Sequence, residues 1–102
     1  MAQRVTTRKV LSDEVQGEGS WVMLRALPYG MVTRRAKIDQ ADMDQVLAFN
    51  QEFLAEVVVD WNWVDDQGAP LSIPANVEQL VIPEFEFIAR AAGLVEGGAK
   101  KA

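Results

Sequence analysis

Residues 56–71 of this 102-residue chain read EVVVDWNWVDDQGAPL, and the rest of the sequence is best understood from this stretch outward. It begins as an apolar run, carries two of the three tryptophans, and then breaks into a polar segment. Gly68 and Pro70 in that segment are typical of a turn, because glycine accepts a positive φ and proline favours turn geometry. The stretch therefore predicts a structural corner with a tryptophan beside the turn.

A long helix is predicted to lead into this corner. It begins at Asp39 or Asp42, since either carboxylate can cap the first turn, and it ends near Asp60 or Trp61. Apolar residues recur within it at three- and four-residue spacing, which places them on one face. They are Met43, Val46, Leu47, Phe53, Leu54, Val57 and Trp61, with Asn50 as the one interruption. We expect this face to supply half of the core.

The two tryptophans of the corner are expected to differ in exposure. Val59, Trp61 and Trp63 alternate with polar residues, which is also the period of a strand. In a helix, however, Trp61 and Trp63 would point roughly 200° apart, at about 100° per residue. With the helix reaching Trp61, the prediction is that Trp61 is buried and that Trp63 is partly exposed and free to contact a partner.

The N-terminal part is predicted to form a β-hairpin from residues 5–15 and 20–27. Between them lies QGEGS, whose two glycines suit a tight loop. The residues expected on the core face of the second strand are Val22, Leu24 and Ala26. A two-stranded hairpin is marginally stable alone, so we expect it to pack across the long helix.

Two shorter helical segments complete the prediction. A basic helix within residues 31–38 carries Arg34, Arg35 and Lys37, which we interpret as a solvated face, with docking of an acidic segment as the alternative. Beyond the corner, we expect a helical turn at residues 76–81 and a last helix at 83–92, which the following glycine ends.

These elements predict an α+β, mainly helical fold: an N-terminal β-hairpin packed on a long central helix and a C-terminal helical segment. The expected division is a flexible N-terminal arm at residues 1–9, one globular domain at 10–95 and a flexible tail at 96–102. The wide apolar face of residues 43–61 leaves room for a homo-oligomer as well as for a core.

Composition narrows the functional classes. The chain has a net charge of −5 and neither cysteine nor histidine, which argues against thiol chemistry, histidine acid–base catalysis and binding to nucleic acid or anionic membrane. Asp60, Asp65 and Asp66 do not match a calcium loop, because Leu71 stands where such a loop needs its twelfth-position glutamate. We therefore expect no enzyme activity, no metal and no cofactor.

Two stretches resemble a known family. Residues 17–25, GEGSWVMLR, are followed by LPYG at 27–30, and residues 60–71, DWNWVDDQGAPL, are followed by Pro74 and a C-terminal helix. In order and separation they resemble the small tail assembly chaperones of long-tailed bacteriophages, over about residues 10–92. That resemblance implies a non-enzymatic protein of the host cytoplasm that coats the tape measure protein until tail tube subunits polymerise around it.

The expected partner-binding residues are Trp63, Tyr29, Arg34 and Arg35. Two alternatives stay open from the sequence. One is a structural tail or head-tail connector component retained in the virion, and the other is a small acidic regulatory binder similar to an antitoxin.

Overall fold

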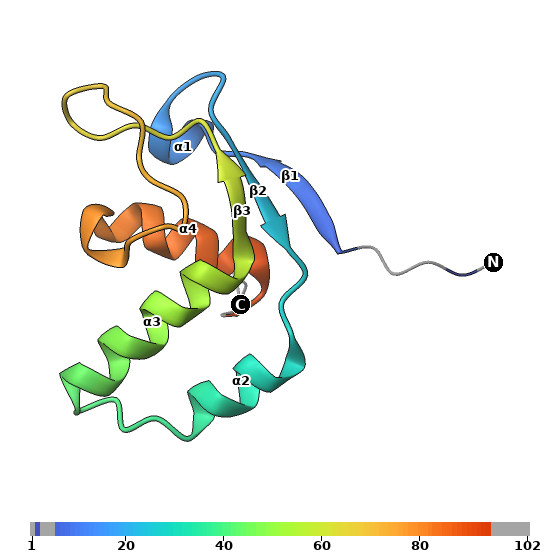
Figure 1. Cartoon of the computed structure of the whole chain (residues 1–102), viewed down its shortest axis with the longest axis vertical. Helices are drawn as coiled ribbons and strands as arrows, with labels where there is room; N and C mark the ends of the chain where they lie inside the picture. The colour runs from blue at the N-terminus through green and yellow to red at the C-terminus, as the bar shows by residue number, and fades with distance from the viewer. Residues whose placement is uncertain (1, 3–5, 95–102) are drawn as a thin grey trace, which may run out of the picture.

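The computed structural model describes residues 2 and 6–94, which form a three-stranded antiparallel sheet in the order β1-β2-β3 with helices packed around it (Figure 1). The expected α+β class with helix dominant is confirmed. The element bounds are β1 Thr7–Leu11, α1 Asp13–Gln16, β2 Trp21–Arg25, α2 Tyr29–Ala36, α3 Met43–Val57, β3 Val58–Trp61, the 3-10 helix η1 Val77–Gln79, and α4 Ile82–Ala92. The predicted tail at residues 96–102 lies outside the described residues.

The first strand of the predicted hairpin is shorter than the expected residues 5–15, because Asp13–Gln16 form the helix α1. The hairpin itself is present as β1 and β2. They pair antiparallel, from Thr7 opposite Arg25 to Leu11 opposite Trp21. The expected domain start at residue 10 is therefore too late, because residues 7–9 of the supposed arm already pair with β2. Val22 and Leu24 are buried as predicted, whereas Ala26 lies beyond the strand and is exposed.

Helix α3 begins where its capping residue predicts. Asp42 accepts hydrogen bonds from the backbone N–H groups of Asp44 (3.1 Å) and Gln45 (3.3 Å), so it is the N-cap. The second half of the predicted apolar face is buried, with Phe53, Leu54 and Val57 at the centre of the core. The first turns differ from the prediction, since Met43 is 72% exposed and Leu47 is 40% exposed.

The predicted end of the long helix is wrong by one turn. The chain leaves α3 at Val57 and enters β3, which pairs antiparallel with β2 through Val22 opposite Trp61 and Leu24 opposite Val58. Three consecutive valines favour this change, since β-branched side chains are restricted in a helix and suit a strand. The hairpin is therefore joined to α3 through a third strand rather than merely packed across it.

The second half of the chain folds back over the sheet and α3. Residues 64–70 form the predicted turn, with Gly68 at a φ of 81°, and η1 and α4 follow close to the expected positions. Gly93 ends α4 in the left-handed conformation, and its N–H reaches the carbonyls of Ala89 and Arg90. Phe87 and Ile88 of α4 complete the core against Trp63 and α3.

Candidate partner-binding surfaces

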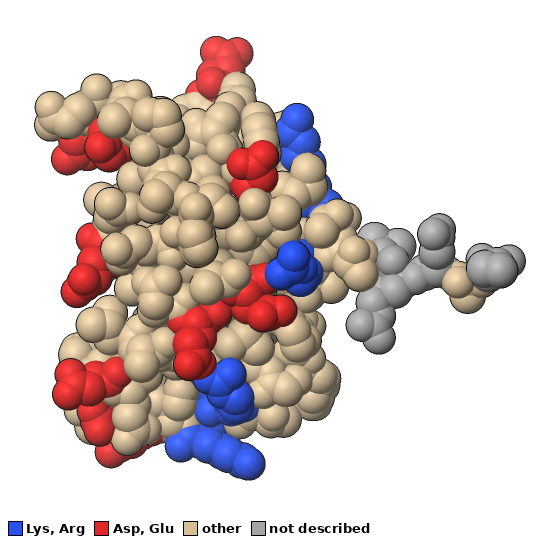
Figure 2. Space-filling view, viewed as in Figure 1, with Lys and Arg blue, Asp and Glu red and all other residues tan. Residues whose placement is uncertain are grey.

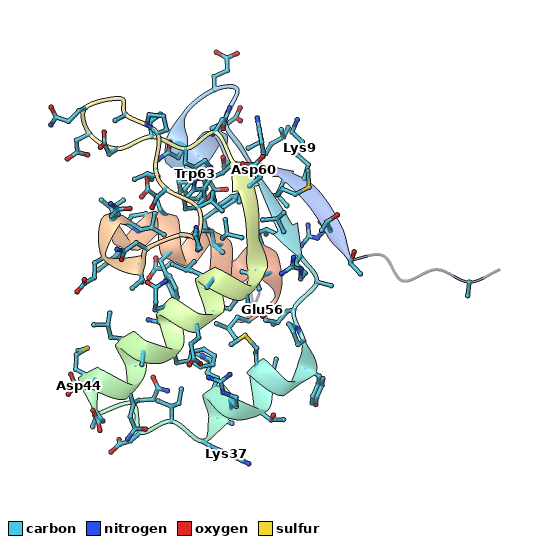
Figure 3. All side chains as sticks on the ribbon, in the orientation of Figure 1. Lys9, Lys37, Asp44, Glu56, Asp60 and Trp63 are labelled. Carbon is cyan, nitrogen blue, oxygen red and sulfur yellow. The ribbon has the colours of Figure 1, made fainter. Side chains whose placement is uncertain are left out.

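Trp63 is a core residue, and the prediction that it is partly exposed is wrong. Its side chain is 0% exposed and lies beside the end of β3 (Figure 3). It stacks on Trp61 with ring centroids 4.8 Å apart and an interplanar angle of 7°. Phe87 of α4 approaches it at 6.3 Å. The error follows from the helix end: residues two apart point to the same side of an extended chain, so both tryptophans enter the same core. The burial of Trp61 is confirmed.

A chain of hydroxyl groups anchors the Trp63 indole. Its Nε1–H donates to Ser12 Oγ at 2.9 Å, Ser12 Oγ lies 2.7 Å from Ser20 Oγ, and Ser20 Oγ donates to the Gly17 carbonyl at 2.8 Å. An indole N–H can only donate and a carbonyl can only accept, so Ser12 must donate its proton to Ser20. Ser12 and Ser20 are buried and both hydroxyl groups are hydrogen-bonded, which indicates a structural role for these two residues.

The two stretches that carry the family resemblance lie against each other. Asn62 accepts from the Trp21 N–H at 2.9 Å and donates to the Gly19 carbonyl at 3.1 Å, so its amide extends the pairing of β2 with β3. Gln16 bonds both the N–H and the C=O of Val64, each at 3.0 Å. The side-chain amides of Asn62 and Gln16 therefore join residues 16–21 to the corner.

The carboxylates near the corner also serve the backbone. Asp65 Oδ1 accepts from the N–H groups of Gln67 (2.8 Å) and Ala69 (3.0 Å), which closes the turn. Glu84, buried at the start of α4, accepts from the Val81 N–H at 3.0 Å and from Gln16 Nε2 at 2.5 Å. In the part of the chain that the structure describes, no group of three or more acidic, histidine or cysteine residues is arranged to hold a metal.

The remaining predicted contact residues all lie on α2. Tyr29 is 80% exposed and borders an open hollow of about 440 Å³ between α2, the end of β2 and the end of α3, with Arg25, Leu27 and Glu56 among its other walls. Its ring therefore stands where a partner can reach it.

Arg34 and Arg35 have different surroundings although they are neighbours. Arg34 forms an ion pair with Glu52 of α3 and lies over the Phe49 ring, 5.7 Å from its centroid, which ties α2 to the body. Arg35 borders a cavity of about 140 Å³ between α2, α3 and α4, whose apolar walls include Phe49 and Leu94. The structure thus places Arg35, rather than Arg34, beside an open apolar space.

A second surface was missed by the sequence reasoning. Met43 and Leu47 on α3 are exposed. Leu47 borders a hollow of about 270 Å³ between α3 and η1, together with Val77 and two acidic residues, Asp44 and Glu78. The sequence did contain a signal: residues 38–89 hold eleven acidic residues and no lysine or arginine. Charge counted by segment, rather than for the whole chain, would have marked this half as acidic.

Comparisons of this chain with models of protein families, with curated proteins and with solved structures found no match. Over the described residues, none of the helices has both the length and the apolar character needed to cross a bilayer.

Proposed function

We propose that this protein is a non-enzymatic tail assembly chaperone of a long-tailed bacteriophage. It binds the tape measure protein in the host cytoplasm, prevents its aggregation and recruits tail tube subunits. The observation that carries the proposal is the exposed side of α2, where Tyr29 and Arg35 each border a hollow. The sequence resemblance supplies the identity of the partners.

The cavity beside Arg35 has the size and lining of a site for a protein side chain. Its volume of about 140 Å³ is below the roughly 300–1,000 Å³ of typical small-molecule sites. Apolar residues form most of its wall, and a guanidinium stands at its edge. Such a site accepts an apolar side chain from an amphipathic helix and pairs with a carboxylate beside it.

The polar groups near the corner favour binding over catalysis. Ser12 and Ser20 hold the Trp63 indole, Asp65 closes a turn, and Glu84 caps α4. Each of these groups makes a structural hydrogen bond, which supports a binding role for the exposed apolar and charged side chains.

Co-expression with the tape measure protein of the same phage tests the proposal. We expect the wild-type chain to raise the soluble fraction of that protein and to be retained with it in a pull-down. Arg35→Glu should reduce both, because it reverses the charge beside the cavity. Glu18→Lys is the control and should behave as wild type, because it reverses a charge by the same magnitude at an exposed position in the loop before β2.

Two results would contradict the proposal. One is a soluble fraction and pull-down that are the same with and without this chain. The other is the presence of the chain in purified phage particles by mass spectrometry, since a chaperone leaves the finished tail, and that result would favour a structural component.

A further inference from the structure

We propose that a second surface of this protein, distinct from α2, binds a basic amphipathic helix of a partner protein. We call it the acidic face and define it by Met43, Asp44, Leu47, Ala48, Val77 and Glu78, from the start of α3 and from η1. The proposal does not rest on the chaperone assignment, because it uses different residues and different chemistry.

The apolar part of the acidic face is open to solvent. Met43 and Leu47 are four residues apart on α3 and therefore lie on one side of that helix, 72% and 40% exposed. Leu47 also borders a hollow of about 270 Å³, together with Ala48 and Val77. Anchors spaced by one helical turn and an adjoining hollow form the kind of surface into which the apolar stripe of another helix packs.

The shape of the hollow is set before any partner arrives. Gln51 of α3 donates to the Ala75 carbonyl at 2.8 Å and accepts from the Val77 N–H at 2.8 Å, so one side chain fixes the approach of η1 to α3. Asn76 caps η1 by accepting from the Glu78 N–H at 3.0 Å. A preformed site loses less conformational freedom when it binds, which favours affinity.

The charge around the acidic face determines which helix it accepts. Asp44 and Glu78 stand at the hollow, and neither lysine nor arginine borders it. Because residues 38–89 hold no basic residue, the lysines and arginines of the described chain lie on β1, β2 and α2, at Lys37 just after α2, and at the end of α4. Figure 2 shows acidic side chains along the edge that includes the start of α3, with basic side chains over α2 and the sheet. This field attracts a cationic partner and repels an acidic one.

The binding test uses a labelled helical peptide of about five turns, with leucines along one side and lysines on the other, titrated with the wild-type chain by fluorescence anisotropy. One control peptide has the same composition with the leucines scattered around the helix, and another has glutamate in place of lysine. We expect at least about tenfold tighter binding of the amphipathic lysine peptide than of either control, and weaker binding as ionic strength rises.

Variants locate the site. Leu47→Gln removes an apolar anchor and should weaken peptide binding by about tenfold. Glu78→Gln removes a charge and should weaken it severalfold. Leu11→Gln changes another exposed apolar residue, 70% exposed on β1, and should leave binding unchanged. Circular dichroism of each variant checks the fold, and Glu78→Gln keeps the test valid if Leu47→Gln alters α3.

Four outcomes would overturn the proposal. Equal binding of the scattered peptide would reduce the effect to diffuse charge attraction. Unchanged affinity in both Leu47→Gln and Glu78→Gln would place the peptide elsewhere. Self-association of the wild-type chain that Leu47→Gln abolishes would show that a second copy occupies the face. Loss of binding in Arg35→Glu alone would assign the peptide to the α2 surface, which separates failure of this proposal from failure of the chaperone proposal.

Discussion

Replacing Trp63 by phenylalanine tests the central claim about the corner, that this residue stabilises the core rather than contacting a partner. The change keeps an aromatic ring against Trp61 but removes the N–H that donates to Ser12 Oγ at 2.9 Å. A typical intramolecular hydrogen bond contributes about 0.5–1.5 kcal/mol to stability. A residual gap of roughly 30 Å³, at about 24 cal/mol per Å³, adds about 0.7 kcal/mol. The free energy of unfolding should therefore fall by about 1–2 kcal/mol.

Urea unfolding followed by far-ultraviolet circular dichroism measures this loss without depending on tryptophan fluorescence. At about 4–8 °C per kcal/mol for a domain of roughly this size, Tm should fall by about 4–16 °C. Trp21→Phe is the matched control and should have a smaller effect, because Trp21 lies on β2 with only part of its surface buried. The expected result for peptide or partner binding is no direct change in affinity for the folded protein.

A double-mutant cycle with Ser12→Ala makes the test specific to the hydrogen bond. Ser12→Ala leaves a buried indole N–H without its acceptor, which costs about 1–3 kcal/mol. The combined change should be less harmful than the two effects added, by about 1 kcal/mol, because the same bond is lost in each. Additive effects, or a Trp63→Phe variant as stable as wild type, would refute the assignment of Trp63 to a bonded core position.

Further predictions concern the hydrogen bonds of the Asn62 side chain and the end of α4. Asn62→Ala removes the hydrogen bonds to the Trp21 N–H and the Gly19 carbonyl, and it should lower the free energy of unfolding in urea titrations by about 1–2 kcal/mol. A change below about 0.3 kcal/mol would show that water fully replaces these two bonds. Gly93→Ala should lower Tm and reduce the free energy of unfolding by about 1–2 kcal/mol, because Gly93 has a φ of 88°. Gly30→Ala within α2 should leave the free energy of unfolding unchanged or raise it by up to about 1 kcal/mol. Equal Tm shifts for the two glycine variants would contradict the left-handed ending of α4.

Local signals predicted most of the elements, though not α1 or β3, and they did not predict which elements pack together. Asp42 as a cap, Gly93 as a helix end and the inward face of Val22 and Leu24 were all readable, because capping, left-handed glycine and strand alternation depend on neighbouring residues. Arg35 was correctly placed on a basic helix, but that helix begins at Tyr29 rather than within residues 31–38. The hollows beside Tyr29 and Arg35 could not be predicted, since the walls come from α3 and α4 as well.

The corner at residues 56–71 shows where the sequence alone reaches its limit. By itself it determined that a turn follows the two tryptophans, because glycine, proline and aspartate have local conformational preferences. Tertiary structure decided that Val58–Trp61 is a strand, since β2 was available to pair with it, and a paired strand turns Trp61 and Trp63 to the same side. It also decided that Met43 and Leu47 stay exposed, because an apolar helical face is buried only where another element covers it.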